Sequence, residues 1–202
     1  MWQRLLEPRS ALDRMLQHGA RHGEIAALLD GLAPQARVAQ ALSLRGSAVQ
    51  RLYDSVADAE PVELSDLVPS GAPAAATFIF EGRNSLPTFS RFQKRFARTA
   101  SGRIVGHNHQ LWSPVTGPGY FVAEPACATA DVPNEPYLDY TQPPGVEPTG
   151  WPRYRANDWG PSLLVFAGLK DYLRRVARGV VVGKAFRRGR PAGQHFVLAS
   201  AE

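Results

Sequence analysis

Residues 180–199, VVVGKAFRRGRPAGQHFVLA, predict a β-hairpin and decide the fold class of this 202-residue chain. Two strand-like segments, 180–187 and 194–199, flank a turn rich in glycine, proline and arginine at 188–193. Apolar runs of this length between turn signals are typical of buried strands. The carboxyl-terminal part of the chain is therefore expected to form an antiparallel sheet.

Working outward from this hairpin, further strands are expected at 77–81, 103–112, 119–123 and 162–167, which makes six in all. Two segments show helical spacing instead. Phe89, Phe92 and Phe96 lie three and four residues apart, which predicts a helix over 87–98 with its rings on one face. Apolar residues at 169–176 have the same spacing and predict a second helix. We expect an antiparallel, strongly curved or barrel-like sheet with one or two helices.

The front of the chain is expected to be helical. Ser10 begins a capping-box-like start, and Pro34 suits a first helical position. Short apolar stripes then follow at helical spacing as far as Val56. The predicted fold is α+β, in three parts: a helical subdomain at 1–60, a linker at 61–76, and a β-rich domain at 77–202 with a proline-rich loop at 124–161.

Composition narrows the class of protein. Hydrophobic residues make up 44% and charged residues 20% of the chain, as in ordinary globular proteins. Cys127 is the single cysteine, so no disulfide can form within the chain. Residues 1–10 lack the apolar run of a signal peptide, and no apolar run is long enough for a transmembrane segment. We expect a cytoplasmic protein whose oligomeric state the sequence leaves open.

Charge is distributed in blocks. Segments 82–123 and 172–201 contain six and seven basic residues and no acidic residue, whereas 124–171 contains seven acidic and three basic residues. We expect the two basic blocks to lie together as one positive surface, partly covered by the acidic segment. Left uncovered, such a surface would attract a polyanion or a membrane.

Residues 106–109, GHNH, resemble the first motif of the cupin family, in which a glycine precedes a His-x-His pair and a glutamate follows. On a strand, His107 and His109 would point the same way and could meet one metal ion. Residues 112–114, WSP, stand where the motif has its glutamate. The sequence therefore predicts two ordinary strand histidines, with no metal and no other cofactor.

Three functions remain open. The leading hypothesis is non-catalytic binding of a small, largely apolar and possibly anionic ligand, because barrels often hold one small ligand in their mouth. The alternatives are an interaction protein that binds a polyanion or membrane surface through the basic blocks, and an enzyme that uses His107 and His109. Nucleic acid is a less favoured partner, since a helix-turn-helix reading offers Arg51 as its one cation. The candidate ligand-binding residues are Arg83, His107, His109, Tyr120, Trp151, Trp159, Arg174 and Lys184.

Overall fold

The computed structural model describes residues 9–86, 90–111 and 113–201. The expectation about a signal peptide concerned residues 1–10, of which 1–8 lie outside the described residues. Phe89, one of the three rings of the predicted helix, lies outside them too.

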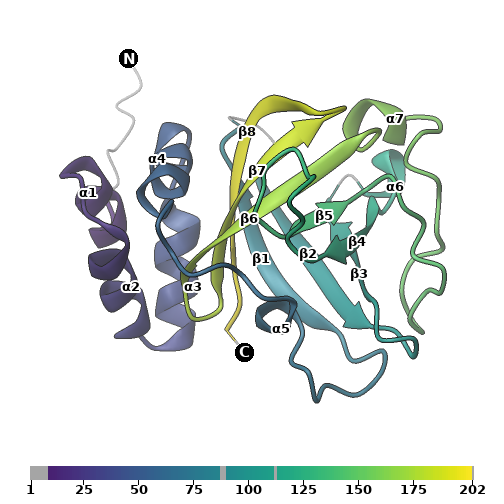
Figure 1. Ribbon diagram of the computed structural model, residues 1–202, viewed down its shortest axis with the longest axis horizontal. Coiled ribbons are helices and arrows are strands. Elements are labelled where there is room, and N and C mark those ends of the chain that lie inside the picture. The colour runs from purple at the N-terminus through teal and green to yellow at the C-terminus, as the bar shows by residue number, and fades with distance from the viewer. Residues whose placement is uncertain (1–8, 87–89, 112, 202) are drawn as a thin grey trace.

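Eight strands form a closed antiparallel barrel (Figure 1). Each strand pairs with its neighbours in sequence, and β8 closes the barrel by pairing with β1. The predicted α+β fold with a barrel-like sheet is confirmed, with eight strands in place of about six. The strands are β1 (Phe78–Asn84), β2 (Arg91–Arg98), β3 (Ile104–His109), β4 (Tyr120–Glu124), β5 (Tyr137–Asp139), β6 (Leu169–Ala177), β7 (Val180–Arg187) and β8 (Arg190–Ala199).

The helix predicted over 87–98 is wrong, because residues 91–98 form β2. A spacing of four residues puts Phe92 and Phe96 on one face of a helix and equally on one face of a strand. Both side chains belong to the apolar cluster inside the barrel, and Phe96 is fully buried. The expectation of buried rings therefore holds for Phe96, although the element was misassigned.

Two further assignments are reversed. The strand predicted at 162–167 is the short helix α7 (Ser162–Val165), and the helix predicted at 169–176 is strand β6. Three strands of the barrel, β2, β5 and β6, were not predicted. β5 lies in the proline-rich loop and pairs with β4 on one side and with β6 on the other. A short helix, α5 (Leu64–Leu67), interrupts the predicted linker.

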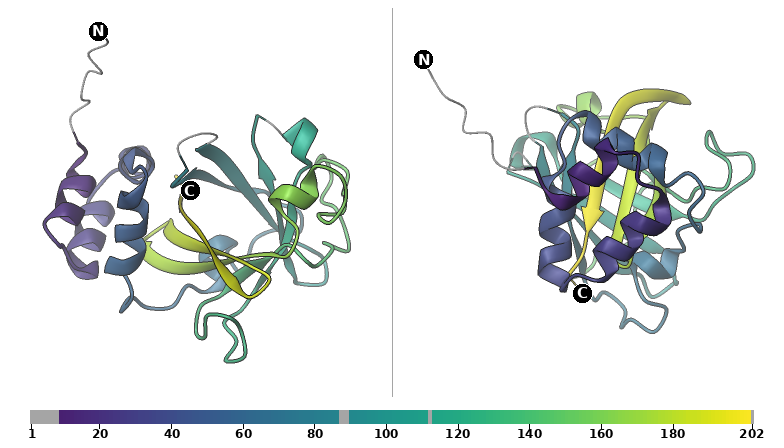
Figure 2. Two further views of the ribbon diagram at one scale, coloured as in Figure 1. Left: turned by 90° about the horizontal axis from the view of Figure 1, so that it is seen from above. Right: turned by 90° about the vertical axis from the view of Figure 1, so that its left-hand side faces the viewer.

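Four helices pack against one wall of the barrel, as both views of Figure 2 show. Their bounds are α1 (Ala11–Gln17), α2 (His22–Asp30), α3 (Pro34–Ser43) and α4 (Ser47–Ser55). Ser10 caps α1 by accepting a hydrogen bond from the Asp13 backbone, and Pro34 begins α3. Leucine and valine side chains of the helices form one apolar cluster with Val176, Val182 and Val197 on the outer face of β6–β8.

The two ends of the barrel differ. At one end α5 and its neighbours add Val62, Leu67 and Val68 to the apolar interior. At the other end, α6 (Ser113–Thr116) and α7 lie together (Figure 1), joined by a hydrogen bond from the Ser162 hydroxyl to the Thr116 carbonyl. Across the described residues, no helix has the length and apolar character needed to cross a bilayer.

Candidate functional site

A cavity of about 500 Å³ opens at the end of the barrel that carries α6 and α7. Inward-facing side chains of β2, β3, β6, β7 and β8 form its wall, and the loops around α6 and α7 form its rim. Small-molecule sites commonly have volumes of about 300–1,000 Å³, so the cavity has a suitable size for one small ligand.

Two phenylalanine rings of the lining lie over glycines of adjacent strands. A Cβ atom at Gly82 would come within 2.6 Å of the Phe92 ring, and one at Gly183 within 2.2 Å of the Phe196 ring. Both glycines face the barrel interior, so a side chain there would push the ring into the cavity. The two glycines therefore help to keep the cavity open.

The rim of the cavity is apolar and exposed. Leu86 and Leu164 line the opening, although 38% and 77% of their surfaces remain accessible to solvent. Val115 of α6 and Leu163 of α7, near the same opening, are exposed as well. Exposed apolar groups that surround an opening are a common feature of binding sites for apolar ligands or partners.

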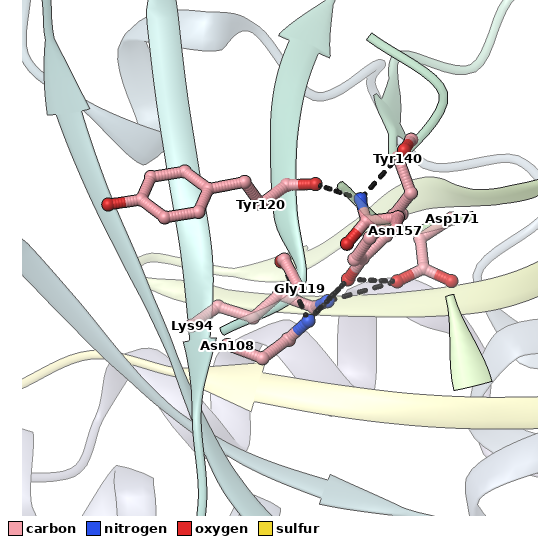
Figure 3. Close-up of polar contacts among 7 residues, drawn as sticks. All are labelled: Lys94, Asn108, Gly119, Tyr120, Tyr140, Asn157 and Asp171. Atoms are coloured by element: carbon pink, nitrogen blue, oxygen red, sulfur yellow. Dashed lines mark hydrogen bonds and ion pairs between the residues drawn. The ribbon is translucent and has the colours of Figure 1, made fainter. Parts of the chain in front are cut away.

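A buried polar network lies in the cavity wall (Figure 3). Lys94 Nζ donates hydrogen bonds to Asp171 Oδ2 at 3.0 Å, to Asn108 Oδ1 at 3.1 Å and to the Tyr140 hydroxyl. The Lys94 and Asp171 side chains are 3% and 6% exposed. Because β2 and β6 are four strands apart in an eight-stranded barrel, this ion pair crosses the lumen.

Aromatic rings surround the ammonium group of this network. Lys94 Nζ lies 5.0–5.6 Å from the ring centroids of Phe92, Phe121, Tyr140 and Phe196. A cation at this distance from a ring face is attracted by the ring's quadrupole. The rings therefore replace part of the hydration that the ammonium group loses on burial.

Burial shifts the titration of two groups in the network. Removal of Lys94 from water lowers the pKa of its amine, and the adjacent Asp171 carboxylate opposes this effect without cancelling it. Burial beside Asp171 raises the pKa of Tyr140 well above its ordinary value. Tyr140 therefore stays a neutral phenol at physiological pH, able to donate and accept hydrogen bonds.

Two asparagines hold the network in place. Asn108 Nδ2 donates to the Gly119 carbonyl at 3.2 Å and to the Tyr140 hydroxyl at 3.0 Å. Asn157 Nδ2 donates to the backbone carbonyls of Tyr120 and Tyr140, both at 2.7 Å (Figure 3). Asn157 belongs to the proline-rich loop, so this loop is tied to β4 and to the residue that follows β5.

Four of the predicted candidates meet on the outside of the barrel instead. His107, His109 and Trp151 line a groove of about 1,060 Å³ outside β2 and β3, and Tyr120 packs beside them. His107 and Trp151 have ring centroids 4.7 Å apart, and the Tyr120 hydroxyl donates to the Pro152 carbonyl at 2.6 Å. The groove also includes four arginines: Arg91, Arg95, Arg153 and Arg155.

His107 is the most unusual member of this groove. Its side chain is buried, and its Nε2 atom has no hydrogen-bond partner among the described residues. Burial lowers the pKa of His107 to about 4, with a further contribution from Arg95 and His109. His107 is therefore neutral at physiological pH.

The other four candidates lie elsewhere. Arg83 donates to the Leu42 carbonyl at 2.8 Å and ties β1 to the end of α3. Arg174 pairs with Glu135 at 2.7 Å and covers the Tyr53 ring, with Lys184 near the same ring. Trp159 is 73% exposed, just before α7. All eight candidates are among the described residues, and the lining of the barrel cavity includes none of them.

The basic blocks are not one surface. β2–β3 and β6–β7 lie on opposite walls of the barrel, so the prediction of a single positive surface over these strands is wrong. Successive side chains of a strand point to opposite faces, so the cations of the basic blocks are divided between the two faces of the wall. Lys94 of β2 lies in the lumen, and Arg174 of β6 pairs with Glu135. In both pairs the acid comes from the 124–171 segment, the acidic segment that was expected to cover part of the basic blocks.

The polar network was not predicted from the sequence, in the first place because two strands were assigned as helices. A helix over 87–98 would place Lys94 away from Phe92 and Phe96, and a helix over 169–176 would pair Asp171 with the arginines that follow it. On strands, Lys94 lies between Phe92 and Phe96 at intervals of two, and Asp171 lies likewise between Leu169 and Leu173. A charged residue flanked by apolar residues at i±2 was the available signal.

Within the part of the chain that the structure describes, no group of three or more His, Cys, Asp or Glu side chains could hold a metal ion. His107 and His109 have no acidic third partner at the place where the cupin motif has one. Cys127 is exposed.

Comparison with known proteins does not assign the chain. Neither a protein-family model, nor a curated protein, nor a solved structure matches it significantly.

Proposed function

We propose that the barrel binds one small, largely apolar ligand in the cavity at its open end. The observation that carries this proposal is the combination of a cavity of about 500 Å³, with largely apolar walls, and the buried polar cluster around Lys94 and Asp171. Ligand sites typically have this composition, with apolar walls for affinity and a few fixed polar groups for orientation.

The charges of the lining favour a ligand with a polar or anionic group. Among the described lining residues, Lys94 and Arg187 are basic and Asp171 is the one carboxylate. The Arg187 guanidinium donates to the carbonyls of Leu164 and Val165 at the rim, which holds its charge near the opening. An anionic group would therefore meet a net positive environment as it enters.

The test is a titration with anilinonaphthalene sulfonate, a fluorescent dye that is both apolar and anionic. The wild-type protein should bind it with one site, and Ala185→Trp should lose binding because Ala185 lines the cavity. Val165→Trp, at the rim, provides a second blocking variant if the first is unstable. Unchanged binding in both folded variants would rule the cavity out.

Trp151→Ala is the matched control, because Trp151 lines the outer groove and not the cavity. This variant should bind the dye as the wild type does. Loss of binding in Trp151→Ala alone would assign the dye to the groove.

One observation favours a second candidate function, the binding of a polyanion. The groove outside β2 and β3 contains four arginines and, among its described lining residues, one carboxylate, Glu81. Heparin affinity measured at increasing salt tests this candidate, since released counterions make such binding fall steeply. Arg91→Gln and Arg153→Gln should each weaken binding, and salt-independent affinity would refute the candidate.

A further inference from the structure

We propose that Lys94 forms an imine with the carbonyl carbon of an aldehyde or ketone bound in the barrel cavity. This inference rests on the proposed function of the cavity as a ligand site, and it names the reactive class of ligand. Lys94 lines a cavity with largely apolar walls, and Asp171, Tyr140 and Asn108 lie within hydrogen-bond distance of its Nζ atom. The groups needed for imine formation are therefore present around one amine.

The amine needs to lose a proton before it can act as a nucleophile. Asp171 Oδ2 lies 3.0 Å from Nζ and can take that proton. A lysine buried in an apolar site holds its proton less tightly than one in water, which is how lysine becomes a nucleophile in proteins. The lowered pKa of Lys94 agrees with this geometry.

The atoms of the reaction balance without a further reactant. The neutral amine attacks the carbonyl carbon, and the C=O π electrons move to the oxygen. The nitrogen loses a proton and the oxygen gains one, with the Tyr140 hydroxyl placed to relay it, which gives a carbinolamine. Asp171 then returns its proton to the carbinolamine hydroxyl, the C–O bond breaks, and the nitrogen lone pair forms the C=N bond. One water leaves, and a protonated imine faces the Asp171 carboxylate.

The site is suited to the product as well as to the reaction. The protonated imine carries the same charge as the ammonium group, so the pairing with Asp171 is kept. The four aromatic rings near Nζ also remain around a cation. Apolar walls limit the access of water that would hydrolyse the imine.

A structural role alone gives a weaker account of this pair. Burying two charges costs about as much free energy as their attraction returns, so an apolar pair often serves stability equally well. The Lys94–Asp171 pair lines the cavity, where atoms of a bound ligand would contact it. Reaction with a ligand explains this position better than stability does.

The chain makes the test clear, because it has three lysines: Lys94, Lys170 and Lys184. The protein is incubated with cinnamaldehyde and sodium cyanoborohydride, and peptide mass spectrometry locates the reduced adduct. We expect one adduct per chain, on Lys94, formed at least tenfold faster than on Lys170 or Lys184. Equal labelling of the three lysines, or none on Lys94, would overturn the proposal.

Cinnamyl alcohol separates this proposal from the proposed function, because it has the same apolar body and no carbonyl group. If the alcohol competes with the dye but the aldehyde leaves Lys94 unlabelled, imine formation is refuted and the ligand site stands. If neither compound competes with the dye and Lys94 stays unlabelled, imine formation is refuted together with the use of the cavity by such ligands.

Variants add a spectroscopic check. Lys170→Met and Lys184→Met should leave the adduct unchanged, whereas Lys94→Met should abolish it. Asp171→Asn should still form some imine, but the long-wavelength absorbance of the protonated form should be lost because its counterion is missing. An unchanged absorbance in Asp171→Asn would contradict the role given to this carboxylate.

Discussion

The two halves of the barrel interior are built from the same strands and differ in what fills them. At the closed end, Phe80, Phe96, Ile104 and Leu198 belong to one apolar cluster with Leu67 of α5, and none of these side chains lines the cavity of about 500 Å³. A second pocket, of about 520 Å³, lies beside α5 and is lined by charged side chains of α2, α5 and β6 as well as by Leu67 and Phe80. At the open end, the same β2 and β6 supply Lys94 and Asp171 to a cavity wall. One half of the lumen is therefore filled by apolar side chains, and the other half leaves space beside a buried ion pair, as the proposed ligand site requires.

The largest effect is expected at the closed end. Phe96→Ala removes a fully buried ring and should lower the free energy of unfolding by about 3–5 kcal/mol, measured by urea denaturation. Phe92→Ala, at the cavity, should cost about half as much or less, because its ring already borders open space. Equal losses in the two variants would contradict the division of the lumen into two halves.

The ion pair should behave as a functional pair and not as a source of stability. Lys94→Met leaves Asp171 buried without its cation and should cost about 3 kcal/mol in unfolding free energy. The double variant Lys94→Met with Asp171→Leu should recover most of that loss, because neither charge then remains. If the double variant is as unstable as the single one, the pair is needed for folding.

The outer wall gives a smaller effect that depends on pH. His107 has a pKa of about 4 when folded against an ordinary value of 6.5, so the unfolded chain binds a proton that the folded chain does not. The free energy of unfolding should therefore be at its full value above pH 6.5, and it should fall by about 1–3 kcal/mol as the pH decreases to 4.

His107→Gln removes this titration, so its unfolding free energy should change less between pH 6.5 and 4 than that of the wild type. His18→Gln, at the exposed residue that follows α1, is the matched control and should keep the wild-type slope. A variant at position 107 with the wild-type slope would show that His107 does not titrate as described.

The smallest effect is expected at the rim. Leu164→Ser changes a side chain that is 77% exposed, so the unfolding free energy should stay within about 0.5 kcal/mol. Dye affinity should nonetheless fall about two- to fivefold, because the ligand covers this side chain as it binds. Unchanged affinity would show that the exposed apolar rim takes no part in binding.

The sequence predicts the barrel better than the site, for a physical reason. Glycine turns and apolar runs mark most strand positions. The predicted hairpin at 180–199 forms, although β8 begins at Arg190, inside the predicted turn at 188–193. Phe92 and Phe96 are four residues apart, a spacing that a helix and a strand satisfy equally. Because a helix was predicted over 87–98, Lys94 was expected on the face away from Phe92 and Phe96. The helix predicted at 169–176 likewise paired Asp171 with the arginines that follow it, and not with a residue in the lumen.

A second limit concerns distance along the chain. Lys94 and Asp171 are 77 residues apart, and their contact depends on barrel closure, which no local pattern encodes. The candidates chosen from local pattern, such as His107 and Trp151, do meet one another, but outside the barrel. Residue type and local spacing therefore identified side chains that do lie together, but could not show that they lie outside the barrel wall and not in the lumen.

A crystal structure of the protein with bound anilinonaphthalene sulfonate tests the central claim most directly. The account predicts density for the dye inside the barrel cavity, in contact with the rings of Phe92 and Phe196 and within reach of the Lys94 network. Density confined to the outer groove beside Trp151, with the barrel cavity containing only water, would contradict it.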